Sequence, residues 1–297
     1  MGKYNVSVVI PSYNGSELLH KNLPALIEAG RYAPNNILEI IVVDDGSKDD
    51  SVKVLNSEFP EVKVIRHKMN RGFSAAVNTG VRAAKGNLIL LMNTDVTPSQ
   101  KFLEPVMKQF NNEKVFAVSL HEKGYGSAKG SFSRGFIQLA MEPEGSSSRQ
   151  SFYVSGGSGV FRRSIWMKLG GMDEKLFSPF YWEDIDICFR AAKRGYLNLW
   201  IPEGLVEHNH ESTITKFSKE YVEGVRERNQ LLMIWKNITS AALIKKHIWG
   251  VFRRILKHPG YVRVVAMALL RIGIVLSERS KEAKQGKLSD EAIFARF

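Results

Sequence analysis

The segment that most constrains the fold is a run of four apolar residues, 40–43, that stops abruptly at Asp44-Asp45-Gly46-Ser47. An uninterrupted apolar run of this kind is typical of a strand that is covered on both faces, as in a parallel sheet. The Gly-Ser pair permits a tight turn, and helical character returns after it. The two carboxylates therefore lie where open α/β sheets bind ligands, outside the carboxyl ends of the strands.

Two neighbouring segments repeat this pattern. The apolar run 6–10 leads into Pro11-Ser12-Tyr13-Asn14-Gly15, and the run 88–92 leads into Asn93-Thr94-Asp95. Because the carboxyl ends of parallel strands meet at one edge of a sheet, we expect the polar groups of all three junctions to form a single site.

Strand and helix patterns alternate along the first hundred residues, which predicts an α/β fold with a Rossmann-like, mostly parallel central sheet and flanking helices. Between residues 121 and 150 the periodicity fades and Gly, Ser, Lys and Glu accumulate, so we expect a long, partly mobile loop there. Further strands are expected at 38–43, 62–67, 115–120 and 197–201, and helices at 16–29, 51–58, 73–84, 102–110, 163–169, 184–194 and 221–236.

The chain of 297 residues is long enough for one large or two modest domains with a real core. Its lone cysteine, Cys188, excludes an internal disulfide framework and any multi-cysteine metal site. Residues 1–5 lead directly into the first strand, without the apolar stretch of a signal peptide. We therefore expect a cytoplasmic protein.

Positive charge is concentrated towards the end of the sequence. The formal net charge is +12, and residues 241–297 contain twelve Lys or Arg against four Asp or Glu, which gives +8. Such an excess predicts an anionic partner: a membrane surface, a nucleic acid or a phosphorylated substrate. The sequence has no zinc-finger spacing, RNP-like aromatic motif or Gly-rich KH loop, so we expect no nucleic acid.

On this basis the chain divides into a main domain of residues 1–237 and a basic amphipathic helical tail of residues 238–297. The apolar run 262–276 is shorter than the roughly 20 residues that span a bilayer and contains Arg263 and Arg271, so it predicts no spanning helix. Two roles stay open for the tail. It is either a basic helix pair on a membrane surface or a helical subdomain that packs on the core or on a second subunit of a homo-oligomer.

Six motifs occur in an order that resembles the family 2 glycosyltransferases, over about residues 6–237. The motifs are Val8–Asn14, Val42–Ser47, Asn70–Asn78, Leu91–Asp95, Gly156–Arg163 and Phe180–Arg190. Within this family the sequence is most similar to the rhamnosyltransferase-like branch, which often has Asn-x-Asp in place of Asp-x-Asp.

The resemblance implies a GT-A fold and the transfer of a sugar, with inversion, from a nucleotide-diphosphate donor. Charge develops on the phosphate oxygens of the leaving group, and a hard divalent cation such as Mn²⁺ or Mg²⁺ neutralises it. By resemblance, Asp95 is a metal ligand and His208, rather than His210, completes the metal site. Asn93 stands where relatives have the first Asp; its amide can hydrogen-bond a ribose but brings no charge. Taken alone, the triplet 93–95 also fits a simple turn.

For the donor, the resemblance places Asp45 at the nucleotide base, with Pro11 and Tyr13 lining the same pocket. Asp44 is expected to hold the turn instead. Arg71 lies where relatives approach the base or the phosphates, and its alternative role is a surface ion pair with an Asp or Glu.

An inverting transfer needs one base to take the proton of the acceptor hydroxyl as that hydroxyl attacks the anomeric carbon. Asp184 is the candidate base, because it opens a predicted helix where the helix dipole favours a carboxylate; its alternative role is a helix cap. Glu183 is the second choice, and Asp186 is expected to be structural or to support the site. The residues expected on the acceptor side are Gly157, Tyr181 and Trp182. For the two aromatic residues an apolar core role is an equal alternative.

These residues predict an inverting glycosyltransferase that moves a sugar to a hydroxyl of a glycan or lipid-linked acceptor in bacterial cell-surface polysaccharide synthesis. The basic tail favours a peripheral position on the cytoplasmic face of the inner membrane. The alternative is a non-catalytic nucleotide-sugar-binding or scaffold protein of the same fold, against which Asp95, Asp184 and His208 argue.

Overall fold

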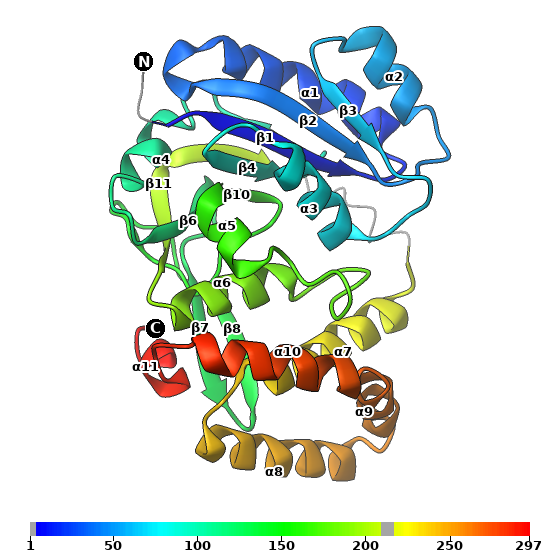
Figure 1. The fold of residues 1–297 in the computed structure, drawn as a ribbon, viewed down its shortest axis with the longest axis vertical. Helices are drawn as coiled ribbons and strands as arrows, with labels where there is room; N and C mark the ends of the chain where they lie inside the picture. The colour runs from blue at the N-terminus through cyan, green and yellow to red at the C-terminus, as the bar shows by residue number, and fades with distance from the viewer. Residues whose placement is uncertain (1–3, 209–216) are drawn as a thin grey trace.

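The computed structural model describes residues 4–208 and 217–297. In this part of the chain a nine-stranded sheet with its flanking helices forms the upper body in Figure 1, and a layer of C-terminal helices lies below it. The strand order is β3-β2-β1-β4-β10-β6-β11-β5, with β9 paired on β11. The strands are β1 (Val6–Ser12), β2 (Ile37–Asp44), β3 (Lys63–Arg66), β4 (Leu88–Met92), β5 (Val96–Pro98), β6 (Val115–Glu122), β9 (Arg149–Gln150), β10 (Ser158–Arg162) and β11 (Leu197–His208).

The sheet is mostly parallel, as the alternation of elements predicted. Strands β1 to β4, β6 and β11 run in one direction, and β5, β9 and β10 run against them. Strands β1 and β4 are buried almost throughout. Burial on both faces explains why their sequences are continuous apolar runs rather than alternating ones.

Helices cover both faces of this sheet. Val8 of β1 shares an apolar cluster with residues of α1 and α4, whereas its neighbour Val9 points to the other face and clusters with residues of α3, α5 and α6. Helix α2 packs against α1. The helices are α1 (Ser16–Arg31), α2 (Ser51–Glu58), α3 (Phe73–Ala83), α4 (Glu104–Gln109), α5 (Arg163–Leu169) and α6 (Glu183–Lys193), close to the expected bounds.

The expectation of a mobile loop at residues 121–150 is wrong. Ala128–Ser133 (β7) and Phe136–Met141 (β8) form an antiparallel hairpin, drawn in green between the sheet and the lower helices of Figure 1. In β8 the first two residues are buried and the other four are exposed, so the alternation that marks a strand in sequence is absent. The surface that covers the hairpin is remote in sequence: Gln230 donates a hydrogen bond to the Ile137 carbonyl, 93 residues away.

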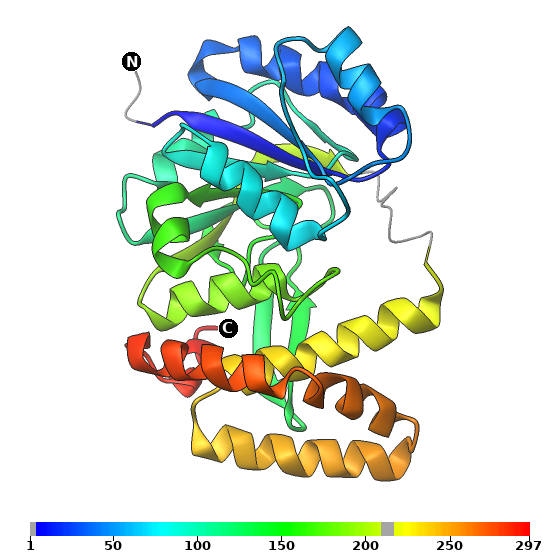
Figure 2. The same ribbon diagram turned by 45° about the vertical axis from the view of Figure 1, so that its right-hand side comes forward.

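The C-terminal part of the chain is helical, as expected. Its helices are α7 (Lys219–Asn237), α8 (Ala241–Lys257), α9 (Tyr261–Leu269), α10 (Ile272–Gln285) and α11 (Asp290–Phe294). Helices α7 and α10 pack together next to the body, and α8 is the element farthest from the sheet in both views (Figures 1 and 2). Within residues 4–208 and 217–297, no helix combines the length and the apolar character needed to cross a bilayer.

A third apolar core joins these helices to the body. It contains Phe136 of the hairpin, Ile185 of α6, Leu232 of α7 and Val264 of α9. The division at residue 237 stays a prediction about independent folding, but the two parts of the chain share this core.

Candidate active site

The three junctions that we expected to meet lie side by side. Strand β1 is placed between β2 and β4, and its register pairs Ser12 with Asp44. A cleft of about 310 Å³ opens at this edge of the sheet. It is lined by nine of the twelve residues predicted for the site, namely Pro11, Tyr13, Asp45, Asn93, Asp95, Gly157, Tyr181, Glu183 and Asp184.

Asp45 is buried, and its carboxylate orders the loop that follows β3. The backbone N–H groups of Arg71 and Gly72 donate to it at 3.0 and 2.8 Å, and His67 Nδ1 lies 2.6 Å from Oδ1. Gly46 permits the preceding turn, because its φ is +76° and a Cβ would lie 2.6 Å from the backbone of that same loop. Asp45 therefore presents its carboxylate to the cleft from a fixed position.

Two polar residues near Asp45 do not face the cleft. Asp44 holds the turn, as expected: it is fully buried, accepts a hydrogen bond from the Ser47 N–H at 3.3 Å and pairs with Arg66 at 3.4 Å. The guanidinium of Arg71 is turned to Glu174, 3.1 Å away, in a partly exposed ion pair. The side chain of Arg71 thus occupies the surface pair that was its alternative role.

Asn93 and Gly157 approach each other closely. The Asn93 N–H donates to the Gly157 carbonyl at 2.8 Å. A Cβ at position 157 would lie 2.5 Å from Asn93 Nδ2, so a larger residue there would displace the Asn93 amide.

Asp95 and His208 meet through a strand pairing that the sequence analysis missed. Strand β11 extends well past its expected end, and β5 pairs with it so that His208 lies opposite Val96. His208 Nε2 is 3.2 Å from Asp95 Oδ1, and Nδ1 is 3.3 Å from Glu122 Oε2. Burial lowers the pKa of His208, but the hydrogen bonds and charges of Asp95 and Glu122 outweigh burial and raise it. His210 lies outside the described residues.

This trio suits a divalent cation. Asp95 and His208 offer an oxygen and a nitrogen donor, and Glu122 can orient the imidazole through its other nitrogen. The described residues contain no group of three or more His, Cys, Asp or Glu that could hold a metal by itself. A cation held here would complete its shell with ligand phosphates and water.

The acidic motif begins with a strained turn. Tyr181 and Trp182 have φ values of +71° and +77°, a backbone region that bulky residues rarely adopt. Asn229 of α7, fully buried, holds this turn, because its Nδ2 donates at 2.9 Å to the carbonyls of both Phe180 and Tyr181. The turn sends the Trp182 indole into the third core, where it is 4% exposed, and leaves Tyr181 lining the cleft. Trp182 therefore has the core role.

Sequence reasoning did not single out several residues of the site. The cleft is also lined by Phe73, Phe180 and Phe217, and the rings of the last two lie 5.8 Å apart. Phe73 and Phe180 lie within the motifs quoted above, so the sequence alone could have placed them near the site. Asn229 has no local signal, since its carbonyl partners lie 48 to 52 residues earlier.

Two carboxylates stand at the start of α6. Asp184 accepts hydrogen bonds from the N–H groups of Ile185 at 2.8 Å and Gly156 at 3.4 Å, yet burial raises its pKa to about 6. Burial and the negative charge of Asp184 raise the pKa of Glu183 well above its usual range. Asp184 thus ionises first, and Glu183 keeps its proton to higher pH. The helix cap position belongs to Trp182 and has no side-chain capping bond.

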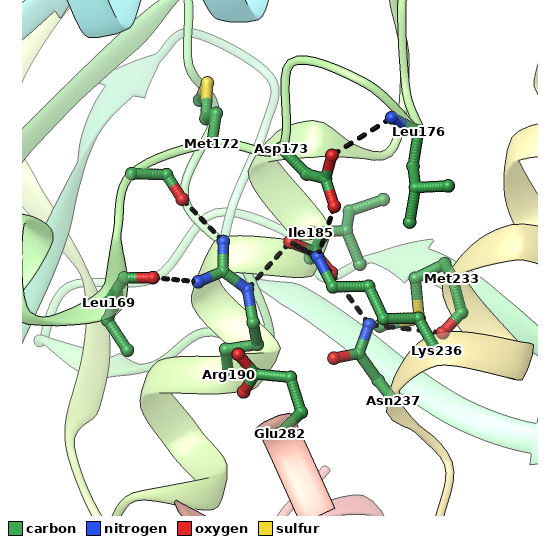
Figure 3. A network of polar contacts seen from close by, with 12 residues as sticks. Leu169, Met172, Asp173, Leu176, Ile185, Arg190, Met233, Lys236, Asn237 and Glu282 are labelled. Atoms are coloured by element: carbon green, nitrogen blue, oxygen red, sulfur yellow. Dashed lines mark hydrogen bonds and ion pairs between the residues drawn. The ribbon is translucent and has the colours of Figure 1, made fainter. Parts of the chain in front are cut away.

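Asp186, two residues further along α6, is embedded in a buried network of charges, and its partners Arg190, Lys236 and Asn237 are labelled in Figure 3. It accepts hydrogen bonds from Arg190 Nε at 2.8 Å, Lys236 Nζ at 3.0 Å and Asn237 Nδ2 at 2.7 Å. Lys236 also donates to Asp173 at 2.9 Å. Burial raises the pKa of Asp186, but the charges of Arg190 and Lys236 outweigh burial and lower it. These contacts give Asp186 the structural role that was expected.

A larger hollow, of about 840 Å³, lies between residues 167–175 and α10. Its charged side chains are largely paired with one another, as in Arg194 with Glu282 at 2.7 Å. The strand-end carboxylates line the smaller cleft instead. We therefore place the site by chemistry and sheet edge rather than by volume.

Comparison with known proteins identifies the family of this chain. Residues 7–170 match the family model for Glycosyl transferase family 2. A pre-mycofactocin glycosyltransferase of Mycobacterium tuberculosis is 29% identical over 224 residues, which cover 71% of this chain and 44% of the relative. The chain spans about half the length of the curated relatives it matches.

Solved structures share the fold. GalNAc-T7 with UDP, GalNAc and Mn²⁺ aligns with a TM-score of 0.64 at 16% identity, over 87% of this chain and 57% of that one. The mannosyltransferase PcManGT from Pyrobaculum calidifontis, with GDP-Man and Mn²⁺, aligns with a TM-score of 0.58 at 16% identity, over 95% and 85%. The fold is therefore GT-A. Because the family model covers more than half of the residues, from β1 to the end of α5, the chain belongs to glycosyl transferase family 2.

Proposed function

We propose that the chain is an inverting glycosyltransferase that uses a nucleotide-diphosphate sugar. The observation that carries this proposal is a single cleft, at the carboxyl edge of the sheet, lined by Asp45, Asp95 and Asp184. This edge is where α/β folds bind nucleotides. Membership of family 2 supports the same reading.

On the donor side, Asp45 binds the base, with Pro11 and Tyr13 as the walls of the base pocket, and Asn93 contacts the ribose. The backbone donors that already hold Asp45 pre-order its carboxylate, so little conformational freedom is lost when the donor binds. Arg71 contributes its backbone N–H to this arrangement.

Asp95 and His208 would hold a divalent cation, Mn²⁺ or Mg²⁺, and Glu122 would orient His208. When bound, such an ion supplies positive charge to the departing diphosphate. The structural neighbours crystallised with Mn²⁺ support a divalent ion. Asn93 brings no charge to it, so the metal affinity depends mainly on Asp95.

Asp184 acts as the base, because it is the carboxylate of the pair that ionises first. The acceptor oxygen bonds to the anomeric carbon while the bond from that carbon to the phosphate oxygen breaks, and the diphosphate leaves with the electron pair. The hydroxyl proton moves to Asp184. Glu183 is buried beside this base, and burial and the charge of Asp184 raise its pKa, which favours its protonated form.

For the acceptor, we propose a hydroxyl of a glycan or lipid-linked glycan in cell-surface polysaccharide synthesis, on the cytoplasmic side of a membrane. Tyr181 lines the cleft beside Asp184 and is 36% exposed, so its ring is available to stack on a sugar. Gly157 leaves room at the same point. The rhamnosyltransferase-like motif makes a deoxyhexose donor the first to test.

A screen of UDP-, dTDP- and GDP-sugars tests this proposal, with donor hydrolysis and thermal stabilisation measured with and without Mn²⁺ or Mg²⁺. We expect one nucleotide class to stabilise the protein in a metal-dependent way and to be slowly hydrolysed. Stabilisation without hydrolysis or transfer to any acceptor would support the non-catalytic binding protein instead. Absence of stabilisation by every donor would contradict both.

A further inference from the structure

Helix α8 presents a row of exposed apolar side chains on its outward face. Ile248, Phe252 and Leu256 recur every four residues and are 65%, 49% and 66% exposed. Trp249, 59% exposed, stacks on Phe252 with ring centroids 5.5 Å apart. The opposite face packs on the protein, and Gly250 approaches the β7–β8 turn so closely that a Cβ would lie 2.5 Å from a backbone carbonyl.

Cations flank this row. Lys245, Lys246, Arg253 and Lys257 are exposed. On the helical wheel, Lys245 falls within the apolar row and the other three lie along one side of it. Residues 241–277 contain seven Lys or Arg and no Asp or Glu, so no neighbour in the segment neutralises them.

Further exposed apolar side chains follow α8 along the chain. Val262 and Leu269 of α9 are 52% and 51% exposed, and Leu270, just after this helix, is 87% exposed. A protein surface that remains in water rarely gathers so many large apolar side chains in one region. We therefore expect another surface to cover these side chains.

We propose that the α8 face, comprising Lys245, Ile248, Trp249, Phe252, Arg253 and Leu256, docks on an anionic lipid bilayer. A helix with an apolar centre and a cationic flank is the pattern that lies in the interface between headgroups and acyl chains. Helix α8 is also the element farthest from the sheet (Figures 1 and 2). A bilayer would therefore contact α8 before it contacted the edge of the sheet. The inference rests on the proposed function only for the identity of the acceptor found there.

Charge distinguishes this occupant from two others. A two-fold interface between copies of the chain would place like cations of α8 against each other, and residues 241–277 contain no carboxylate to balance them. A nucleic acid would match the cations, but not a row of Ile, Phe and Leu side chains at the centre of the face. Anionic lipid satisfies both the charge and the apolar row.

Vesicle co-sedimentation of the full chain tests the proposal, with phosphatidylcholine vesicles compared with vesicles that contain phosphatidylglycerol. We expect binding to the anionic vesicles that weakens with salt. The emission of Trp249 should shift to shorter wavelength. Of the other four tryptophans, Trp166, Trp182 and Trp200 are already buried, and half-buried Trp235 is held by a hydrogen bond to His247.

Two sets of substitutions separate the two contributions. Changing Phe252, Leu256 and Ile248 to Ser should lower the partition coefficient about 100-fold or more. Changing Lys245, Arg253 and Lys257 to Gln should cost about fivefold per cation and remove the preference for anionic lipid. The matched control is Leu38→Ser with Met167→Ser, which alters apolar residues of similar exposure, 51% and 48%, on β2 and α5. Circular dichroism and thermal melts check that each variant folds.

The outcomes are distinct. Equal sedimentation with and without phosphatidylglycerol, or no effect of the serine variant, would overturn the proposal. A soluble dimer that the serine variant dissociates, with no vesicle binding, would make a second copy the occupant. Binding to duplex DNA in place of vesicles would overturn it as well. Donor hydrolysis, measured on the same samples, is expected to persist in the serine variant, so failure of vesicle binding and failure of the proposed activity are separable.

Discussion

Helix α6 carries carboxylates in two opposite electrostatic settings. At its first turn, Glu183 is buried and Asp184 is half-buried beside the cleft, neither is paired with a cation among the described residues, and the pKa values of both are raised. Two residues later, Asp186 is surrounded by Arg190, Lys236 and Asn237, and its pKa is lowered. The same helix thus holds one carboxylate able to take up a proton and one that keeps its charge.

The two settings suit different roles: the first suits a carboxylate that reacts, and the second suits one that stabilises the fold. Uncompensated burial of a carboxylate costs stability but tunes it towards proton transfer near neutral pH. Compensated burial ties α6 to α7 and so fixes the position of the reactive pair. Substitution of Asp184 should therefore mainly lower activity, and substitution of Asp186 should mainly lower stability.

Replacement of Asp184 by Asn should have the largest effect. Loss of the base should lower the transfer rate by about 10²–10⁴-fold, while donor binding and folding persist. The measurement is transfer to acceptor, with donor affinity from thermal stabilisation. Glu113→Gln, an exposed carboxylate change, is the control. Retention of full activity in D184N would show that Glu183 or another residue, not Asp184, is the base.

Replacement of Asp186 by Asn should mainly cost stability. It leaves Arg190 and part of the Lys236 charge buried without their carboxylate, a loss of about 3–5 kcal/mol in the free energy of unfolding. Urea unfolding measures it, with Asp50→Asn on the exposed start of α2 as control. A change below about 1 kcal/mol would contradict the supporting role of the network.

Replacement of Asn229 by Ala should disturb the strained turn before α6. Three buried carbonyls lose their donor, which should cost about 1–3 kcal/mol in stability and lower kcat more than it changes the donor KM. Gln230→Ala is the control, since the Gln230 amide donates to the hairpin rather than to the turn. Equal losses in both variants would remove the special role of Asn229.

The raised pKa of Asp184 predicts the direction in which stability changes with pH. Because the folded-state pKa, about 6, exceeds the ordinary value of 3.8, the folded protein binds more protons between these values. Stability contributed by the protonated form is therefore lost as pH rises through this window. Asp184→Asn should then stabilise the protein, by about 1–2 kcal/mol more at pH 8 than at pH 5.

The activity should follow the opposite direction with pH. The value of kcat/KM should rise as pH increases through about 6, because the base must be ionised. A flat profile between pH 5 and 8, or destabilisation by D184N at pH 8, would show that Asp184 is not the high-pKa carboxylate of the site.

Arg71→Gln should have the smallest effect. Its ion pair with Glu174 is exposed, so its loss should change stability by about 0–1 kcal/mol. The donor KM should also change little, because the guanidinium is held away from the cleft. A rise in donor KM of about tenfold or more would indicate a charge-assisted bond to the diphosphate.

Several parts of the fold and the site were predictable because they depend on local patterns. The runs ending at Asp45, Asn93 and Ser12 predicted adjacent strands, and burial on both faces of β1 and β4 explains why. Gly157 lies within a quoted motif, and its close contact with Asn93 explains why a small residue suits this position.

Other parts depend on contacts between distant segments. Strand β8 of the hairpin lacks alternation, and a residue that covers it, Gln230, follows about 90 residues later in the chain. His208 reaches Asp95 only through the pairing of β5 with an extended β11. Tyr181 and Trp182 are sequence neighbours with equivalent expectations, and the positive-φ turn sends one to the cleft and the other to the core.

The sequence by itself determined the alternating α/β architecture, the polar strand ends that meet at one edge and the basic character of the last helices, because apolar periodicity and charge are local properties of the chain. Only the tertiary structure decided which carboxylate of α6 can take a proton and which stays charged. That choice depends on burial, on Arg190 of α6 itself and on Lys236, which α7 brings from fifty residues away.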